Sequence, residues 1–120
     1  ELCCILEYLH GFNGNGILHM DIKPDNIMLD INGKVKLIDF DNAVAGNAGV
    51  SVDSGSPLYA APEQYSGEYA VTQSDGYSVG MVILFMVSHG HIKTDKGHNL
   101  AGIPRRYSRL YHVIEKSIHH

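Results

Sequence analysis

Residues 19–26 read His-Met-Asp-Ile-Lys-Pro-Asp-Asn, and this polar loop decides how the rest of the chain is arranged. Two short apolar runs follow it, at residues 27–29 and 35–38, and both are typical of β-strands. Between them lies Asn32-Gly33, a pair that favours a tight hairpin turn. The predicted hairpin brings position 26 close to position 39, although thirteen positions separate them in the sequence.

The loop and the end of the second strand carry the groups that phosphoryl transfer needs. Moving a phosphoryl group from ATP requires an acceptor hydroxyl held in line and a divalent metal that neutralises the phosphates. The carboxylate of Asp21 can orient such a hydroxyl and accept its proton, and Lys23 can balance charge on the transferring group. Asn26 and Asp39 supply oxygen ligands of the kind that suit Mg²⁺. The pattern therefore predicts a base, a cation and two metal ligands around one point.

Three more segments follow this loop in a fixed order. Residues 36–41 read Lys-Leu-Ile-Asp-Phe-Asp, residues 55–63 read Gly-Ser-Pro-Leu-Tyr-Ala-Ala-Pro-Glu, and residues 74–80 read Ser-Asp-Gly-Tyr-Ser-Val-Gly. Together with the loop, they closely resemble the protein kinase family, and in particular its serine/threonine branch. The resemblance covers residues 1–88 well and the remainder weakly.

The resemblance implies roles for the residues nearest to the nucleotide. Asp21 matches the catalytic-loop aspartate, and Asn26 matches the metal-binding asparagine five residues later. Asp39 matches the start of the Asp-Phe-Gly motif and would be the second metal ligand, while Lys23 would help to bind ATP. The implied cofactors are ATP and Mg²⁺, and the implied partner is a protein substrate with a Ser or Thr hydroxyl as acceptor.

Other matched residues are implied to support the loop. Ser56 and Glu63 belong to the activation segment, with Ser56 expected to form hydrogen bonds near Asp21. Asp75 would anchor the catalytic loop from a core helix, and His19 would stiffen the loop by packing and hydrogen bonding. In the family, the glutamate that matches Glu63 pairs with a late arginine. We expect these 120 residues to end before that arginine, for which Arg105, Arg106 or Arg109 could substitute.

The fold implied by the resemblance is α+β and predominantly α. It is part of the C-terminal lobe of a kinase, in which helices accompany a short β-hairpin that carries the catalytic and metal-binding loops. We expect residues 1–120 to be a partial catalytic domain without the N-terminal lobe. Residues 1–22 contain no Lys or Arg, so the lysine that grips ATP upstream of the catalytic loop is absent from them, as is a Gly-rich phosphate loop.

Two departures from the family leave a second function open. Met20 stands where many kinases carry an arginine that pairs with a phosphorylated activation loop, and a thioether cannot form that pair. Asp41 replaces a glycine, which permits backbone angles that other residues resist, and it adds a carboxylate near Asp39. A catalytically impaired scaffold or binding module is therefore the alternative to an active kinase. A small helical protein with chance motifs is a third interpretation, and it predicts no hairpin.

Composition and charge argue against several other classes of protein. A chain of 120 residues with 44% hydrophobic and 18% charged residues is typical of one globular domain. A formal charge of −4 indicates no basic surface for nucleic acid. The longest apolar run, residues 79–87, is too short to cross a membrane, and we expect a cytoplasmic protein. Adjacent Cys3 and Cys4 do not favour a relaxed disulfide or a closed zinc site.

Hydrophobic periodicity predicts three helices, at about residues 1–10, 74–88 and 107–118. Residues 41–58 are predicted to form a long loop, and residues 89–104 are polar and irregular. One stripe of the second helix is predicted to lie in the core: Val79, Val82, Ile83 and Met86. One face of the last helix is predicted to be apolar: Leu110, Val113, Ile114 and Ile118.

Plainer interpretations compete with several of these assignments. Asp and Asn favour turns and caps, and Asp75 could simply cap a helix. His19 could serve as a base instead of packing. Phosphorylation is an alternative for four side chains: Ser51, Ser54, Ser56 and Tyr59. A metal site is an alternative to exposure in solvent for a group of histidines: His89, His91, His98, His119 and His120.

Overall fold

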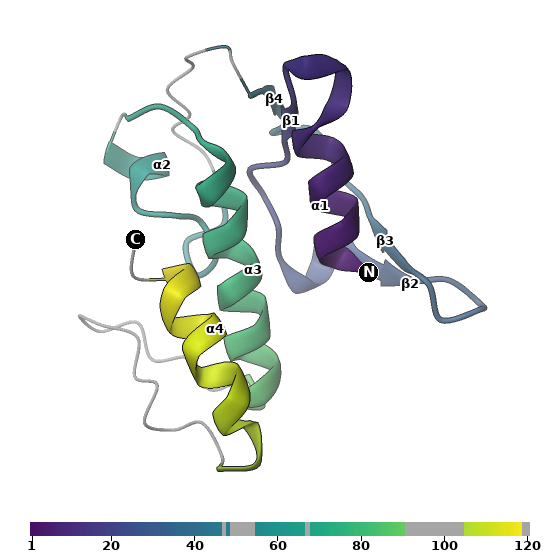
Figure 1. The fold of residues 1–120 in the computed structure, drawn as a ribbon, viewed down its shortest axis with the longest axis vertical. Coiled ribbons are helices and arrows are strands. Elements are labelled where there is room, and N and C mark those ends of the chain that lie inside the picture. Colours follow the sequence, from purple (N-terminus) through teal and green to yellow (C-terminus); the bar gives the residue numbers. More distant parts are fainter. Residues whose placement is uncertain (47, 49–54, 67, 91–104, 119–120) are drawn as a thin grey trace.

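The computed structural model describes residues 1–46, 48, 55–66, 68–90 and 105–118 (Figure 1). Its α-helices are α1 (Leu2–His10), α2 (Glu63–Ser66), α3 (Thr72–Val87) and α4 (Ser108–Ile118). Its strands are β1 (Ile17–Leu18), β2 (Ile27–Leu29), β3 (Val35–Leu37) and β4 (Val44–Ala45), and 3₁₀ turns lie at Phe12–Gly14, Pro24–Asn26 and Arg105–Tyr107. Helices with small antiparallel sheets confirm the predicted α+β class.

The hydrophobic core forms around α3. α4 packs along α3, and the 19–26 loop is bonded to the N-terminal half of the same helix (Figure 1). α1 contributes Leu6 and Leu9 to this core, and α4 contributes Ile114 and Ile118. The buried apolar side chains of α3 are Val79, Met81, Val82, Leu84 and Val87.

One predicted core position, Met86, is wrong, and the predicted apolar face of the last helix is only partly buried. Met86 of α3 is 68% exposed, and Val113 of α4 is 49% exposed. A hydrophobic period identifies one face of a helix, but it does not show how far the neighbouring elements extend along or around that face. Met81 and Leu84 lie off the predicted stripe and are buried instead, because α3 is covered on more than one side.

β2 and β3 form the antiparallel hairpin that the sequence predicts. Ile27 pairs with Leu37, and Leu29 pairs with Val35. Gly33 in the turn has φ 74°, a left-handed conformation that glycine adopts without steric cost. The hairpin contradicts the interpretation that the motifs occur by chance in a small helical protein.

A second sheet joins β1 to β4, and the sequence does not predict it. Ile17 pairs with Ala45, and Leu18 pairs with Val44. Residues 41–58 are therefore not a loop throughout, contrary to the prediction. A strand of two residues is too short to show an alternating pattern, so only its tertiary partner identifies it.

α3 begins at Thr72, two positions earlier than predicted. The hydroxyl oxygen of Ser74 accepts a hydrogen bond from the N–H of Val71 at 3.3 Å, next to the start of the helix. Asp75 lies inside the first turns and is fully buried, so the interpretation of this residue as a helix cap is wrong.

Some predicted features lie outside the described residues. They are Ser51, Ser54, His91, His98, His119, His120 and the side chain of Arg109. In the described part of the chain, no helix is long and apolar enough to span a membrane. Within the same ranges, no group of three or more His, Cys, Asp or Glu side chains is placed to hold a metal ion.

Gly80 allows α3 and α4 to approach closely. A Cβ atom at this position would lie 2.5 Å from Cβ of Ser117 and 3.1 Å from Cγ2 of Ile118. Carbon atoms that are not bonded prefer separations of roughly 3.5–4.0 Å, so a larger residue would push the helices apart. Gly76 on the same helix has no neighbouring atom within 4 Å of the equivalent position.

We expect Gly80→Ala to destabilise the fold by about 1–3 kcal/mol, because overpacking between α3 and α4 outweighs the better helix propensity of Ala. Gly76→Ala is the matched control and should be neutral or stabilising by up to about 1 kcal/mol. Urea unfolding followed by circular dichroism measures both free energies. Equal stabilities for the two variants would contradict the close contact at Gly80.

Candidate active site

Asp75 connects α3 to the 19–26 loop. Its Oδ1 accepts a hydrogen bond from the N–H of Met20 at 2.9 Å. Its Oδ2 accepts from the N–H of His19 at 2.9 Å and from Nε2 of His10 at 2.8 Å. A fully buried carboxylate is tolerated only where donors replace the water that it has lost. Here three donors from two segments do so.

The residue before Asp21 has an unusual backbone conformation. Met20 has φ 66°, in the left-handed region, which costs a residue other than glycine about 1–3 kcal/mol. Buried side chains hold both of its backbone polar groups. Asp75 accepts from its N–H, and Nε2 of Gln64 donates to its C=O at 2.9 Å. The thioether of Met20 is itself fully buried and offers no group to the surface.

The carboxylate of Asp21 is the centre of a hydrogen-bonded cluster. Its Oδ2 accepts from Nζ of Lys23 at 2.8 Å and from Nδ2 of Asn26 at 3.2 Å. Its Oδ1 accepts from the hydroxyl of Ser56 at 3.0 Å, and Lys23 donates to that hydroxyl at 3.0 Å. The structure therefore brings together four residues that the sequence analysis selected, one of them 35 positions beyond Asp21.

The cluster sets the charges of Asp21 and Lys23. Burial alone would raise the pKa of the Asp21 carboxyl group, but hydrogen bonds from Lys23 and Ser56 and the charge of Lys23 bring that pKa below its ordinary value. The hydrogen bond to Asp21 in turn raises the pKa of Lys23. At neutral pH the pair is therefore a carboxylate next to an ammonium group. A carboxylate that stays ionised at neutral pH can accept a hydrogen bond from a hydroxyl group and orient it.

His19 lies fully buried between the loop and the segment after β3. Its Nε2 is 3.0 Å from the carbonyl oxygen of Ile38, and its ring packs edge-on against Phe40 with 4.7 Å between ring centroids. Its Nδ1 is 3.4 Å from the backbone nitrogen of Asp21. These contacts are internal to the fold, so they favour packing over a direct role as a base.

The hairpin places Asn26 beside Ile38, the residue that directly precedes Asp39. The N–H of Ile38 donates to the carbonyl oxygen of Asn26 at 2.9 Å. Asp39 is exposed and has φ 63°, and its charge contributes to the raised pKa of Lys23. Nδ2 of Asn26 also donates to the backbone carbonyl of Asp21 at 2.8 Å, so the amide oxygen of Asn26 is the atom available to a cation.

The donor atoms of Asn26 and Asp39 fit Mg²⁺. Both residues offer hard oxygen ligands, and both lie at the open end of the β2–β3 hairpin. Mg²⁺ is commonly held by one or two protein carboxylates, with phosphates and water completing its coordination. Two protein ligands are therefore enough for a metal that arrives together with a nucleotide.

Asp41 fits its position without backbone strain. It is exposed. It is not one of the described non-glycine residues that have a positive φ. Its N–H lies 3.5 Å from Oδ1 of Asp39. The objection that an aspartate cannot replace glycine here for conformational reasons therefore does not apply to this structure.

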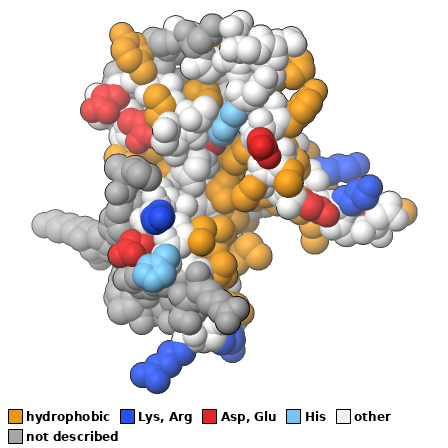
Figure 2. All heavy atoms as spheres, in the orientation of Figure 1, with side chains coloured by type: hydrophobic (Ala, Val, Ile, Leu, Met, Phe, Trp, Pro, Cys, Tyr) orange, Lys and Arg blue, Asp and Glu red, His pale blue; other side chains and the backbone are white. Residues whose placement is uncertain are grey.

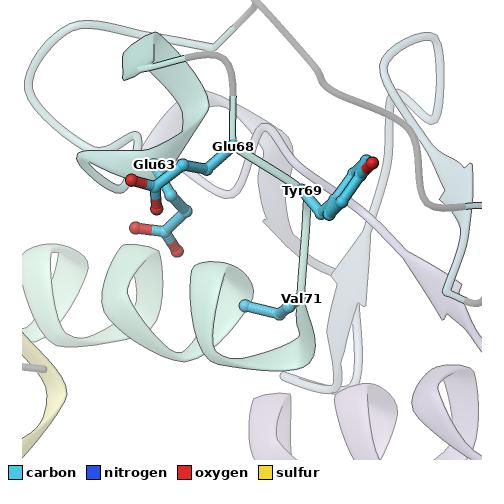
Figure 3. Close-up of a pocket in the computed structure, with 4 residues that line it drawn as sticks. All are labelled: Glu63, Glu68, Tyr69 and Val71. Atoms are coloured by element: carbon cyan, nitrogen blue, oxygen red, sulfur yellow. The ribbon is translucent and has the colours of Figure 1, made fainter.

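Glu63 begins α2 and lines an open pocket of about 580 Å³ with Glu68, Tyr69 and Val71. Figure 3 shows the carboxylates of Glu63 and Glu68 on the same side of the pocket, with the Tyr69 ring turned away from them. Oε1 of Glu63 accepts the hydroxyl of Ser74 at 2.6 Å. Among the arginine side chains that the structure describes, none forms an ion pair with Glu63.

Two residues of the site were missed by the sequence analysis. His10 supplies the third donor to Asp75, and Gln64 holds the carbonyl group of Met20. A histidine at the end of a helix and a single glutamine are both common in proteins. A single sequence therefore does not show that either residue belongs to the site. Their importance comes from partners 65 and 44 positions away.

Residues 1–117 match the protein kinase domain. This chain belongs to the protein kinase family. The resemblance predicted from the four ordered segments is therefore confirmed.

Individual kinases are similar to this kinase chain over most of its length. NUAK family SNF1-like kinase 2 of Rattus norvegicus is 38% identical over 94 residues, which cover 76% of this chain and 15% of that protein. Sucrose non-fermenting protein kinase 1 of Fusarium virguliforme is 35% identical over 113 residues, which cover 92% of this chain and 15% of that protein. SNF1-like protein kinase ssp2 of Schizosaccharomyces pombe is 38% identical over 90 residues, which cover 72% of this chain and 15% of that protein. These similarities confirm the serine/threonine branch, and the chain spans about 15% of the length of these relatives.

We expect the bonds to Asp21 to make the stability of the fold depend on pH. Because the pKa of Asp21 is lower in the folded chain than in the unfolded chain, its contribution is present above the unfolded value and is lost as the pH falls through the folded value. Urea unfolding at about pH 7 and about pH 3 should therefore show a smaller loss of stability for Asp21→Asn than for the parent chain. The same loss in both chains would contradict a stabilising carboxylate at this position.

Proposed function

We propose that this chain supplies the catalytic loop of a protein kinase that transfers the γ-phosphoryl group of ATP to Ser or Thr hydroxyls of a protein substrate. The observation that carries the proposal is the convergence of Lys23, Asn26 and Ser56 on the carboxylate of Asp21. Residues 1–120 would then form part of the large lobe of the kinase, and membership of the kinase family supports this assignment.

Asp21 is the proposed base. In the structure its Oδ1 accepts the hydroxyl hydrogen of Ser56 at 3.0 Å, and the hydroxyl of a substrate Ser or Thr can form the same kind of hydrogen bond. The lowered pKa keeps Asp21 ionised and ready to accept that bond. Its contribution is then to point the attacking oxygen at phosphorus and to take the proton as the new O–P bond forms.

Lys23 is the proposed cation that balances charge on the transferring group. Its raised pKa keeps the ammonium group charged, and its Nζ lies within 3.0 Å of both Asp21 and Ser56. A positive charge held beside the base is suited to stabilising the negative charge on the phosphoryl oxygens.

Asn26 and Asp39 are the proposed ligands of Mg²⁺. When bound, the metal would neutralise charge on the phosphates of ATP. Asn26 also bonds to both the backbone and the carboxylate of Asp21, so one side chain would fix a metal ligand relative to the base. The positions of the base and of the metal would therefore be set together.

The β2–β3 hairpin exposes hydrophobic side chains next to these groups. Met28 is 52% exposed, Leu29 is 66% exposed and Ile31 is fully exposed. Figure 2 shows hydrophobic side chains over the face beside the projecting hairpin, with charged side chains near its tip. We propose that this apolar surface forms one side of the nucleotide cleft, and that the remaining side comes from parts of a kinase outside these 120 residues.

We expect Asp21→Asn to lower the phosphoryl-transfer rate of the intact kinase about 10²–10⁴-fold, because an amide cannot accept the proton of the attacking hydroxyl. The measurement is transfer of radiolabelled phosphate from ATP to a Ser/Thr peptide mixture. Asp30→Asn is the matched control. Asp30 lies in the hairpin turn, and its Oδ1 accepts the backbone N–H groups of Asn32 and Lys34, as an amide oxygen also can.

A phosphoryl-transfer rate in Asp21→Asn equal to that of the parent would show that Asp21 is not the base. An inactive parent with the same fold would favour the alternative, a kinase-like scaffold or binding module. That alternative draws on Met20 and Asp41, the two positions that depart from the family pattern.

We expect the isolated 120-residue chain to bind Mg-ATP poorly and to have no measurable kinase activity. Its sequence contains no Gly-rich phosphate loop followed by a lysine, so it lacks the groups that would hold the phosphates in line with Asp21. Isothermal titration calorimetry with Mg-ATP measures the binding. A dissociation constant in the micromolar range would contradict this expectation.

A further inference from the structure

Gln64 is the buried residue of α2, and its side-chain amide bonds outside that helix. The residue is 1% exposed. Its Nε2 donates to the carbonyl oxygen of Met20 at 2.9 Å, and its Oε1 accepts the N–H of Ala61 at 3.0 Å. One amide group therefore joins the start of α2 to the 19–26 loop, across 44 positions of sequence.

The peptide group that Gln64 contacts is the one that joins Met20 to Asp21. The C=O of Met20 and the N–H of Asp21 lie in one rigid plane, so a hydrogen bond to this oxygen helps to fix the direction in which Asp21 leaves the loop. Met20 has φ 66°, and a strained conformation of this kind persists only where the surrounding structure holds it. Asp75 holds the N–H of Met20, and Gln64 holds its C=O.

The segment next to Gln64 also contacts the carboxylate of Asp21. Gly55 has φ 132° and passes so close to Gln64 that a Cβ atom there would lie 2.8 Å from Nε2. The hydroxyl of Tyr65 donates to the carbonyl oxygen of Gly55 at 3.2 Å, and the adjacent Ser56 donates to Asp21. Residues 55–65 therefore contact the loop twice, at the carboxylate of Asp21 through Ser56 and at the carbonyl group of Met20, in the peptide that precedes Asp21, through Gln64.

We propose that Gln64 is a positioning residue, which fixes the peptide plane of Asp21 relative to residues 55–66 and so couples that segment to the orientation of the base. This inference rests on the proposed kinase function. Gln64 does not touch the reacting groups, so its effect is on how well the Asp21 carboxylate points at the acceptor hydroxyl. Asn26 and Asp39, the proposed metal ligands, are not bonded to Gln64 in the described part of the chain. Nucleotide binding should therefore be little affected.

Two substitutions separate the donor function of Gln64 from its size. Gln64→Glu keeps the shape and the acceptor for Ala61 but removes the donor to Met20. Gln64→Met keeps the length, introduces no charge and removes the side-chain hydrogen bonds to Met20 and Ala61, so it provides the test if Gln64→Glu does not fold. Gln73→Met is the matched control, because Gln73 is exposed on α3.

In the intact kinase, we expect both Gln64 variants to lower kcat about 10–100-fold, since misplacing a reacting group by about 1 Å can cost that much. The KM for ATP should stay within about twofold of the parental value, and Gln73→Met should match the parent in both constants. A kcat equal to that of Gln73→Met would overturn the proposal. A raised KM for ATP together with a parental kcat would overturn the proposal as well.

Hydrogen exchange tests the same inference without catalysis. We expect the backbone amides of residues 19–21 to exchange faster in both Gln64 variants than in the parent and in Gln73→Met. If the parent proves inactive, the proposed kinase activity fails, while the exchange rates still decide whether Gln64 holds the loop. Unchanged exchange at residues 19–21 would overturn the positioning role whatever the activity.

Discussion

The buried carboxylate of Asp75 determines where the polar loop of this chain lies. It is fully buried in the core helix α3, and three N–H groups, from His10, His19 and Met20, take the place of water around it. A buried acceptor that loses its donors costs about 1–3 kcal/mol, and more when it is charged. The loop therefore cannot move away from α3 without leaving an uncompensated carboxylate in the core, and a hydrophobic helix thereby sets the position of a polar site.

Once the loop is held, the chemistry of the site follows from a few short contacts. The ammonium group of Lys23 and the hydroxyl of Ser56 keep Asp21 ionised despite its burial. Two residues other than glycine near this cluster, Met20 and Asp39, have left-handed backbone conformations. Conformations of this kind concentrate at functional sites because the surrounding network holds them there. At Met20 that network is visible, since both backbone polar groups are bonded to buried side chains.

The same contacts join segments that lie far apart in the chain. Ser56 and Gln64 bring the region before and within α2 to Asp21, and Asp75 brings α3 to the residues before it. The segment around residues 55–66 is thus bonded to the loop at more than one point. These hydrogen bonds are the contacts through which that segment is connected to Asp21 and Met20.

The sequence by itself determined α1, α3 and α4, the β2–β3 hairpin and the grouping of Asp21, Lys23 and Asn26 in one loop, whereas it gave no sign of the short helix α2. Asp21, Lys23 and Asn26 fall within six consecutive positions, and a hairpin of known turn chemistry brings the chain back to Asp39. These are local relations, which periodicity and turn residues reveal. They also carried the family resemblance, because the matched segments are short and contiguous.

Only the tertiary structure decided which remaining side chains hold the loop. His10 and Gln64 became part of the site through partners 65 and 44 positions away, and no local pattern encodes such a pairing. Met86 and Val113 are exposed for the same reason, since burial depends on where neighbouring elements end and not on the period of the helix itself. Hydrogen bonds and packing between distant segments depend on where the whole chain places them in space, so their partners cannot be read from one stretch of sequence.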